Sequence, residues 1–230
     1  MNDAEIAVLL FGDEYALRRC RPLRGLGRSR ANQRLPRPLR TLTVVDVGEI
    51  DAAAQNSRRL IVVGSDADLA AVLTRLLRIE KLDVELGFVP ARRTPATRVY
   101  RLPVGRRAAR RARRGSARQM PLIRDETGSA IVGAADWRPV GDGQPLHGEA
   151  VVDDTVLFDG DVAGVRVEPT AALPGLRARV AHRRPRRWVT GRAAQLGATG
   201  AVVVRDGVSA GRPVRRSTFY RHTQGWLLVR

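Results

Sequence analysis

A short acidic loop between an apolar run and a leucine-rich segment is the stretch of this sequence best suited to chemistry. It consists of Gly64, Ser65, Asp66, Ala67 and Asp68, and it follows the β-branched run 60–63. Backbone amides at the start of a helix attract phosphate groups, and a carboxylate beside them can orient a Mg²⁺-bound nucleotide. This order of strand, glycine, acid and helix predicts a phosphate-binding loop. The structural alternative is that the two aspartates cap the helix that follows.

Two arginine-rich segments are candidates for anion binding. Arg92, Arg93 and Arg98 lie in the segment ARRTPATR, where their forked guanidinium groups match phosphate oxygens, although a solvated loop fits equally well. In the segment RRAARRARR, a helix would place Ala108, Ala109 and Ala112 on one side. Its other side would carry Arg106, Arg107, Arg110, Arg111, Arg113 and Arg114. We expect Arg107, Arg110 and Arg114 to bind anionic lipid headgroups or nucleic-acid phosphates, with a solvated face as the alternative.

The first half of the chain must position these residues through alternating strands and helices. Apolar runs predict strands at 5–11, 41–47, 60–63 and 83–90, and helical spacing predicts helices at 48–59 and 68–81. Alternation in such short units is typical of a doubly wound, mostly parallel α/β domain, whose ligands lie at the carboxyl ends of its strands. The Arg-, Gly- and Pro-rich stretch 18–40 is predicted to be a long basic loop.

The second half has a different pattern. Short β-like runs are separated by the turn sequences DETG, FDGD and RDGV, which predict an antiparallel, sandwich-like β domain. We therefore expect an α/β domain at 1–103, a basic linker helix at 104–118 and a β domain at 119–230. In the C-terminal segment, Phe219, Tyr220 and Trp226 are expected to complete a core, with a base-stacking platform as the alternative.

The segment GSDADLAAVLTRLL resembles a signature of the diacylglycerol kinase and sphingosine kinase family of lipid kinases. That family has a GGDGT-type loop followed by a helix similar to LNEVLNGLL, which matches Gly64, Asp66, Leu69, Val72 and Leu73 here. Its next loop, of the PLGTxND type, corresponds to Pro90 and Thr94. The resemblance implies a lipid kinase fold with ATP and Mg²⁺ as cofactors. The implied nucleotide contacts are Gly64, Ser65, Asp66, Asp68 and Thr94.

The sequence departs from the family pattern at the residues that carry the chemistry. Ser65 and Ala67 replace two glycines of the phosphate loop, and Pro174 stands where the family has an aspartate resembling the catalytic base. Asp206 is retained, but Val208 replaces the glutamate that follows in the family. No catalytic residue is therefore assigned. We expect a lipid kinase-like protein that is weakly active or non-catalytic; the alternative is a basic module that binds nucleic acid or an acidic partner.

Whole-chain properties set further bounds. The 230 residues carry a formal charge of +18, and Lys81 is the only lysine among 41 basic residues, which a GC-rich genome explains as well as an anionic partner does. The three histidines lack metal-ligand spacing, so no metal site is predicted. Cys20 cannot form an intrachain disulfide, and no apolar run is long enough to span a membrane. A cytoplasmic protein is expected, with a peripheral position at the membrane surface as the alternative.

Overall fold

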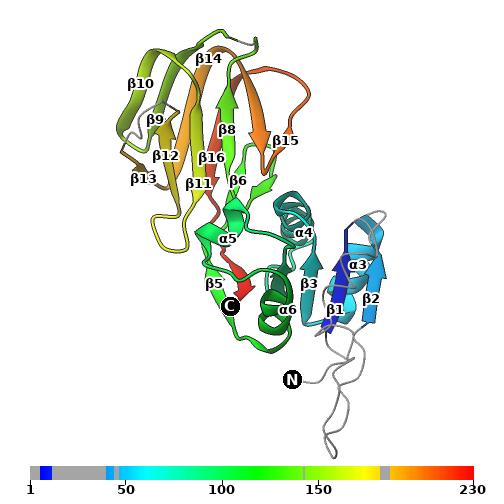
Figure 1. Cartoon of the computed structure of the whole chain (residues 1–230). Coiled ribbons are helices and arrows are strands. Elements are labelled where there is room, and N and C mark those ends of the chain that lie inside the picture. Colours follow the sequence, from blue (N-terminus) through cyan, green and yellow to red (C-terminus); the bar gives the residue numbers. More distant parts are fainter. Residues whose placement is uncertain (1–5, 12–39, 44–46, 142, 182–186) are drawn as a thin grey trace, which may run out of the picture. The chain divides into compact units, whose positions relative to one another are not determined.

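A computed structural model describes residues 6–11, 40–43, 47–141, 143–181 and 187–230 (Figure 1). The chain divides into two compact units, Met1–Met120 with Trp226–Arg230, and Pro121–Gly225. Apart from residue 40, the basic loop expected at 18–40 lies outside the described residues. No helix in the described part of the chain is both long and apolar enough to cross a membrane.

The first unit contains a six-stranded, mostly parallel sheet with the order β2-β1-β3-β4-β17-β5. Every neighbouring pair is parallel except β17 and β5. The strands are β1 (Ile6–Leu10), β2 (Arg40–Thr43), β3 (Arg59–Val63), β4 (Glu85–Val89), β5 (Ala117–Met120) and β17 (Trp226–Val229). The predicted parallel α/β domain is confirmed.

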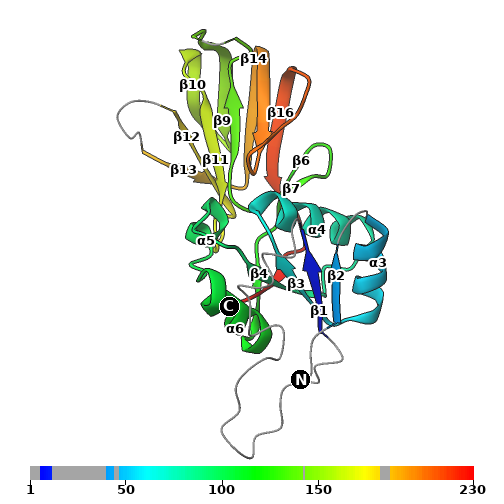
Figure 2. The same ribbon diagram turned by 45° about the vertical axis from the view of Figure 1, so that its right-hand side comes forward.

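Helices cover both faces of this sheet. The helices of this unit are α3 (Val47–Asn56), α4 (Asp66–Arg78), α5 (Pro95–Val99) and α6 (Gly105–Arg114), of which α3, α4 and α6 pack on the strands. Ile61 and Val63 of β3 are buried in one cluster with the alanines of α6. Because successive strand residues point to opposite faces, Leu60 and Val62 face the other side, where α3 and α4 pack (Figure 2). This arrangement is the expected doubly wound fold.

The basic helix α6 is part of the first unit. Ala108, Ala109 and Ala112 are buried, and Ala112 approaches β4 so closely that a Cβ on Gly87 would lie 2.8 Å from its methyl group. Five of the arginines are exposed as expected, but Arg113 is buried, so it does not belong to the exposed basic face. The sequence patterns predict that this helix is a linker and that the last strand belongs to the second domain. In the structure, both α6 and β17 belong to the first unit.

A buried arginine holds the end of α6. Arg59 is only 2% exposed, and its guanidinium donates hydrogen bonds to the carbonyls of Ala112, Arg113 and Gly115 at 2.9–3.0 Å. Its Nε also donates to Glu85 Oε2 at 2.7 Å. The last carbonyls of a helix have no partner within the helix, so this one side chain supplies the C-terminal cap.

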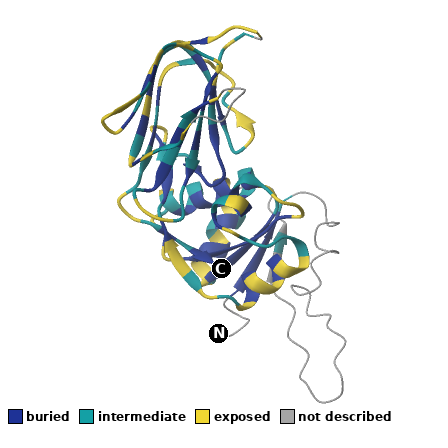
Figure 3. Ribbon diagram, turned by 60° about the vertical axis from the view of Figure 1, so that its left-hand side comes forward, coloured by how far each residue is buried: buried dark blue, intermediate teal, exposed yellow. Residues whose placement is uncertain are grey.

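The second unit is antiparallel throughout, as predicted. Its strands pair in the order β13-β12-β11-β8-β14-β16-β6-β7, with β9, β10 and β15 joined through β14. They are β6 (Ile123–Asp125), β7 (Ala130–Ile131), β8 (Ala135–Arg138), β9 (Leu146–Val152), β10 (Thr155–Val162), β11 (Val165–Pro169), β12 (Leu176–Val180), β13 (Val189–Gly191), β14 (Ala193–Arg205), β15 (Val208–Ser209) and β16 (Val214–Arg221). Buried and less buried residues alternate along these strands, so the inward residues form one apolar core (Figure 3).

Most of the C-terminal aromatic side chains lie in the cores. In the second unit Phe219 stacks on Trp137 at 5.7 Å between ring centroids, and the Trp137 indole donates to Ser217 Oγ at 3.0 Å. In the first unit Trp226 makes an edge contact with Tyr100 at 5.5 Å. Phe219 and Trp226 are almost fully buried, so they cannot stack on bases.

Candidate functional site

The predicted phosphate loop lies at the carboxyl end of β3, where it starts α4. Ser65 is the N-cap of this helix, and its hydroxyl accepts the Asp68 backbone N–H at 3.3 Å. Asp68 Oδ2 in turn accepts the Ser65 backbone N–H at 2.7 Å. This reciprocal pair is a capping box, which satisfies two amide donors within the loop itself. Ala67 is the second residue of the helix and needs no left-handed backbone conformation.

Gly64 is required by the position of the Asp68 side chain. A Cβ on Gly64 would lie 2.5 Å from Asp68 Oδ2, closer than any ordinary contact. The glycine therefore makes room for a carboxylate of the protein itself. In a phosphate-binding loop, glycine instead lets the backbone approach the ligand.

Asp66 has a different role from the cap predicted for it. Its side chain is 5% exposed, and Oδ2 accepts the backbone N–H of Ala96 at 2.9 Å. Ala96 lies in the first turn of α5, so Asp66 ties the first loop to the second. Oδ1 of the same carboxylate is buried without a hydrogen-bond partner among the described residues. A carboxylate oxygen in this state can take a hydrogen-bond donor or a cation, but not a phosphate oxygen.

The second loop is also organised around a helix start. Thr94 is the N-cap of α5, and its hydroxyl accepts the Thr97 backbone N–H at 3.2 Å. Arg92, Arg93 and Arg98 are exposed, and no ion pair joins them to a described residue. Their guanidinium groups are free to meet an anion from solvent. The Thr94 hydroxyl is already engaged.

The electrostatics of the α4 start favour a cation over a phosphate. Asp66 and Asp68 place two carboxylates in the first turn, where they already compensate the positive end of the helix dipole. An approaching phosphate would meet negative charge at this point. Among the described residues, no group of three or more His, Cys, Asp or Glu side chains is arranged to hold a metal ion.

Two further positions singled out in the sequence have structural partners. Pro174 lies in the turn between β11 and β12, where its carbonyl accepts a hydrogen bond from Arg221 at 3.0 Å and its ring offers no base. Asp206 begins the turn between β14 and β15 with a φ of 47°. Its carboxylate accepts the backbone N–H groups of residues 132–134 at 2.7–3.0 Å. Asp206 therefore fixes the chain just before β8.

The sequence did not reveal the bond between Asp66 and Ala96. Its only signal was the ThrProAlaThr stretch, because Thr followed by Pro is a typical helix start and creates amide donors that need acceptors. The helix α5 was also not predicted, because it is only five residues long and shows no helical periodicity.

The fold defined by these two units is that of diacylglycerol kinases and NAD kinases. Among solved structures, a diacylglycerol kinase from Bacillus anthracis superposes with a TM-score of 0.68 at 11% identity, covering 98% of this chain and 96% of the other. An NAD kinase from Archaeoglobus fulgidus in complex with ATP gives a TM-score of 0.61 at 12% identity, covering 98% and 93%. Yeast NADH kinase complexed with NADH gives 0.54 at 9% identity, covering 97% and 82%. No protein-family model and no curated protein matches the sequence.

Proposed function

We propose that this chain is a diacylglycerol kinase-like protein that does not transfer phosphate from ATP at a significant rate. The observation that carries the proposal is the Asp68 carboxylate bound to the Ser65 backbone N–H at the head of α4. A side chain of the protein occupies a donor that a phosphate loop would offer to its ligand. The resemblance to kinases supports the ancestry of the fold, and the loop geometry argues against the activity.

Phosphoryl transfer depends on positioned phosphates, a metal ion and an oriented nucleophile. Loss of a general base alone removes about 10²–10⁴-fold in rate, and the proline at position 174 has no group to replace it. The repulsion between a phosphate and the two carboxylates of the α4 start would add to this loss. ATP and Mg²⁺, the cofactors implied by the resemblance, are therefore expected to bind weakly.

Calorimetric titration with Mg·ATP tests the proposal. The wild-type chain should release little heat, and Asp68→Ala should bind more tightly, because it frees the Ser65 N–H and removes one negative charge. Asp83→Ala is the matched control, since Asp83 is exposed and its replacement removes the same charge outside the loop. Tight Mg·ATP binding by the wild type, unchanged by Asp68→Ala, would refute this proposal. Diacylglycerol and NAD are the acceptors to test for turnover, because the similar structures are kinases of these classes.

We further propose that the exposed face of α6 contacts an anionic lipid surface. Arg107, Arg110, Arg111 and Arg114 line a shallow concavity of about 450 Å³, and no acidic partner for them is found among the described residues. Like charges three and four residues apart destabilise a helix by about 0.2–0.5 kcal/mol per pair. An anionic partner would relieve this repulsion. The aromatic residues Tyr100 and Trp226 of this unit are buried and cannot stack on bases, which favours a lipid surface over a single-stranded nucleic acid.

Vesicle binding at increasing salt tests this contact. Binding to phosphatidylserine vesicles should weaken as salt rises, and the triple variant Arg107→Gln, Arg110→Gln, Arg114→Gln should show a flatter salt dependence. The matched control replaces three exposed arginines of the second unit by glutamine: Arg212, Arg215 and Arg216. Equal slopes for the two triple variants, or binding to DNA but not to vesicles, would contradict the lipid contact.

A further inference from the structure

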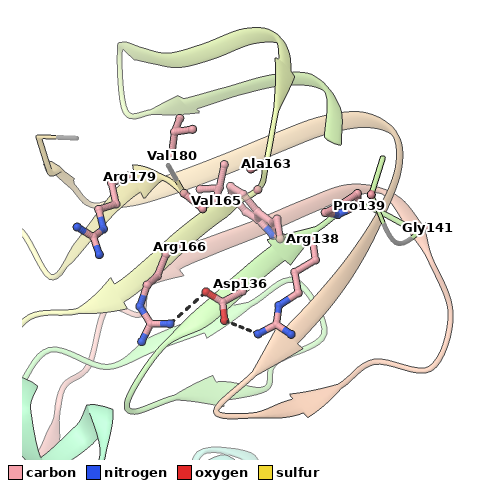
Figure 4. Close-up of a pocket in the computed structure, with 13 residues that line it drawn as sticks. Asp136, Arg138, Pro139, Gly141, Ala163, Val165, Arg166, Arg179 and Val180 are labelled. Carbon is pink, nitrogen blue, oxygen red and sulfur yellow. Dashed lines mark hydrogen bonds and ion pairs between the residues drawn. The ribbon is translucent and has the colours of Figure 1, made fainter. Parts of the chain in front are cut away.

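The second unit contains a pocket that the kinase-like features do not use. It has a volume of about 520 Å³ and lies at the ends of β8, β11 and β12. Its charged lining is formed by Asp136, Arg138, Arg166 and Arg179, which Figure 4 shows on neighbouring strands. Pockets of this size hold small organic ligands, and a few convergent polar groups fix the orientation of such a ligand.

Ion pairs satisfy part of this charge. Asp136 accepts from Arg138 at 3.1 Å and from Arg166 at 3.2 Å (Figure 4). Glu168 lies two residues after Arg166 on the same face of β11, and it pairs with Arg166 at 2.8 Å and with Arg177 at 2.7 Å. Desolvation raises the pKa of Glu168, but the hydrogen bonds and charges of these two arginines outweigh it, and the net pKa lies below its ordinary value of 4.5. Both carboxylates are therefore fully used.

Positive charge remains in excess on this face of the sheet. Among the described residues of this face, four arginines (Arg138, Arg166, Arg177 and Arg179) lie beside two carboxylates, which leaves two positive charges without a compensating acid. Arg166 and Arg179 also lie directly opposite each other across β11 and β12, a position in which like charges repel. Arg166 is turned to its two acids, whereas Arg179 has no ion pair with any described residue.

We propose that this pocket binds the phosphate group of a small phosphate monoester through Arg138, Arg166 and Arg179. A phosphate monoester carries a charge of about −1.5 to −2 at neutral pH, which matches the excess on this face. Guanidinium groups keep several donors free after one ion pair, and their planar forks fit phosphate oxygens in pairs. The pocket is larger than a phosphate alone, so the organic part of the ester occupies the rest of it. This inference goes beyond the proposed function and does not depend on the loop at α4.

A tryptophan beside the pocket provides an intrinsic reporter. Two guanidinium groups contact the ring of Trp188, with Arg179 at 4.5 Å and Arg177 at 4.3 Å from the ring centroid. The other two tryptophans of the chain are buried in the cores, and Trp188 is half-buried. A phosphate that draws Arg179 away from the ring would change the fluorescence of Trp188. Trp137 also lines the pocket, so the variant Trp188→Phe is needed to assign the change to Trp188.

Fluorescence titration of the full chain with inorganic phosphate and with glycerol 3-phosphate tests the site. Both should give a saturable change in tryptophan emission, and calorimetry should give the same affinity. Arg179→Gln should weaken the affinity at least about tenfold, because one charge-assisted contact is lost. Arg138→Gln is the second variant; this side chain is 58% exposed, so its loss should not disturb folding. Arg212→Gln, an exposed arginine outside the pocket, is the matched control.

The remaining arms separate the sources of the phosphate. Binding to phosphatidic acid vesicles that Arg179→Gln weakens, without binding to glycerol 3-phosphate, would assign the site to a lipid headgroup, and the reverse to a soluble ester; either supports a phosphate site. Vesicle binding that Arg179→Gln leaves unchanged would belong to the α6 face and, without glycerol 3-phosphate binding, would count against the pocket. Trp188→Phe should lose the fluorescence change while calorimetric binding persists. No saturable signal in either assay, an equal effect of chloride, or affinities unchanged in both Arg179→Gln and Arg138→Gln would overturn the proposal.

Discussion

Replacing Arg59 by methionine should destabilise the first unit more than any exposed substitution in it. The change leaves Glu85 without its buried partner and removes the donors to three carbonyls at the end of α6. Removing one partner of a buried ion pair costs about 3–5 kcal/mol, because the other charge stays buried and unpaired. We expect the free energy of unfolding to fall by this amount in Arg59→Met.

Arg58→Met is the control for that measurement. Arg58 precedes Arg59 in the chain and contacts the same Glu85, but at 3.7 Å and with its side chain 67% exposed. Exposed ion pairs contribute less than about 1 kcal/mol, so this variant should remain close to the wild type. Adding Glu85→Leu to Arg59→Met should restore part of the loss, since it removes the unpaired carboxylate but not the uncapped carbonyls.

Urea denaturation gives the free energy of unfolding, and amide hydrogen exchange of residues 105–114 shows whether α6 has become locally unstable. Arg59→Met should lower the urea midpoint and speed exchange throughout α6. The reasoning is refuted if Arg59→Met and Arg58→Met have the same midpoint, or if exchange in α6 is unchanged in Arg59→Met.

Three further outcomes follow from single contacts. Gly64→Ala should lower the free energy of unfolding by about 1–3 kcal/mol, because the added methyl group overpacks against Asp68. In denaturant titrations, adding Asp68→Ala to Gly64→Ala should remove much of this loss, and strictly additive effects of the two changes would argue against the contact. The stability that Glu168 contributes should be present above pH 4.5 and be lost as the pH falls through its lowered pKa. Glu168→Gln should therefore flatten the stability profile in acid, and a superimposable profile would contradict this. Ser217→Ala should lower the free energy of unfolding by about 1–3 kcal/mol, because the buried Trp137 indole loses its hydrogen-bond acceptor. A thermal unfolding midpoint within error of the wild type would contradict this expectation.

The sequence predicted the fold class because its hydrophobic patterns differ between the two halves. Residues 60–63 and the leucines of α4 fell where periodicity placed them, and the β runs of the second half were recognisable from their turns. The position of β17 was not predictable, because a four-residue strand of a parallel sheet has the same local pattern whichever sheet it joins. Pairing partners far apart in the chain are decided by tertiary packing, which local patterns do not contain.

The candidate site was only partly accessible from the sequence. The residues of the loop at Gly64 were identified, but the roles of Asp66 and Asp68 depended on where their carboxylates point. The arginine pocket was missed, although β11 and β12 carry charged residues at every outward position. That alternation indicates an exposed charged face, but the unequal pairing of Arg166 and Arg179 follows from strand register, which the sequence does not specify.

Transfer of labelled phosphate from ATP in the presence of Mg²⁺, with diacylglycerol and with NAD as acceptors, tests the central claim most directly. The loop at α4 holds its own carboxylate on the Ser65 N–H, and position 174 supplies no base, so we predict no labelled product from either acceptor. Turnover by the purified chain that disappears in Asp66→Ala would contradict this account, because it would show that the loop still positions a nucleotide for catalysis.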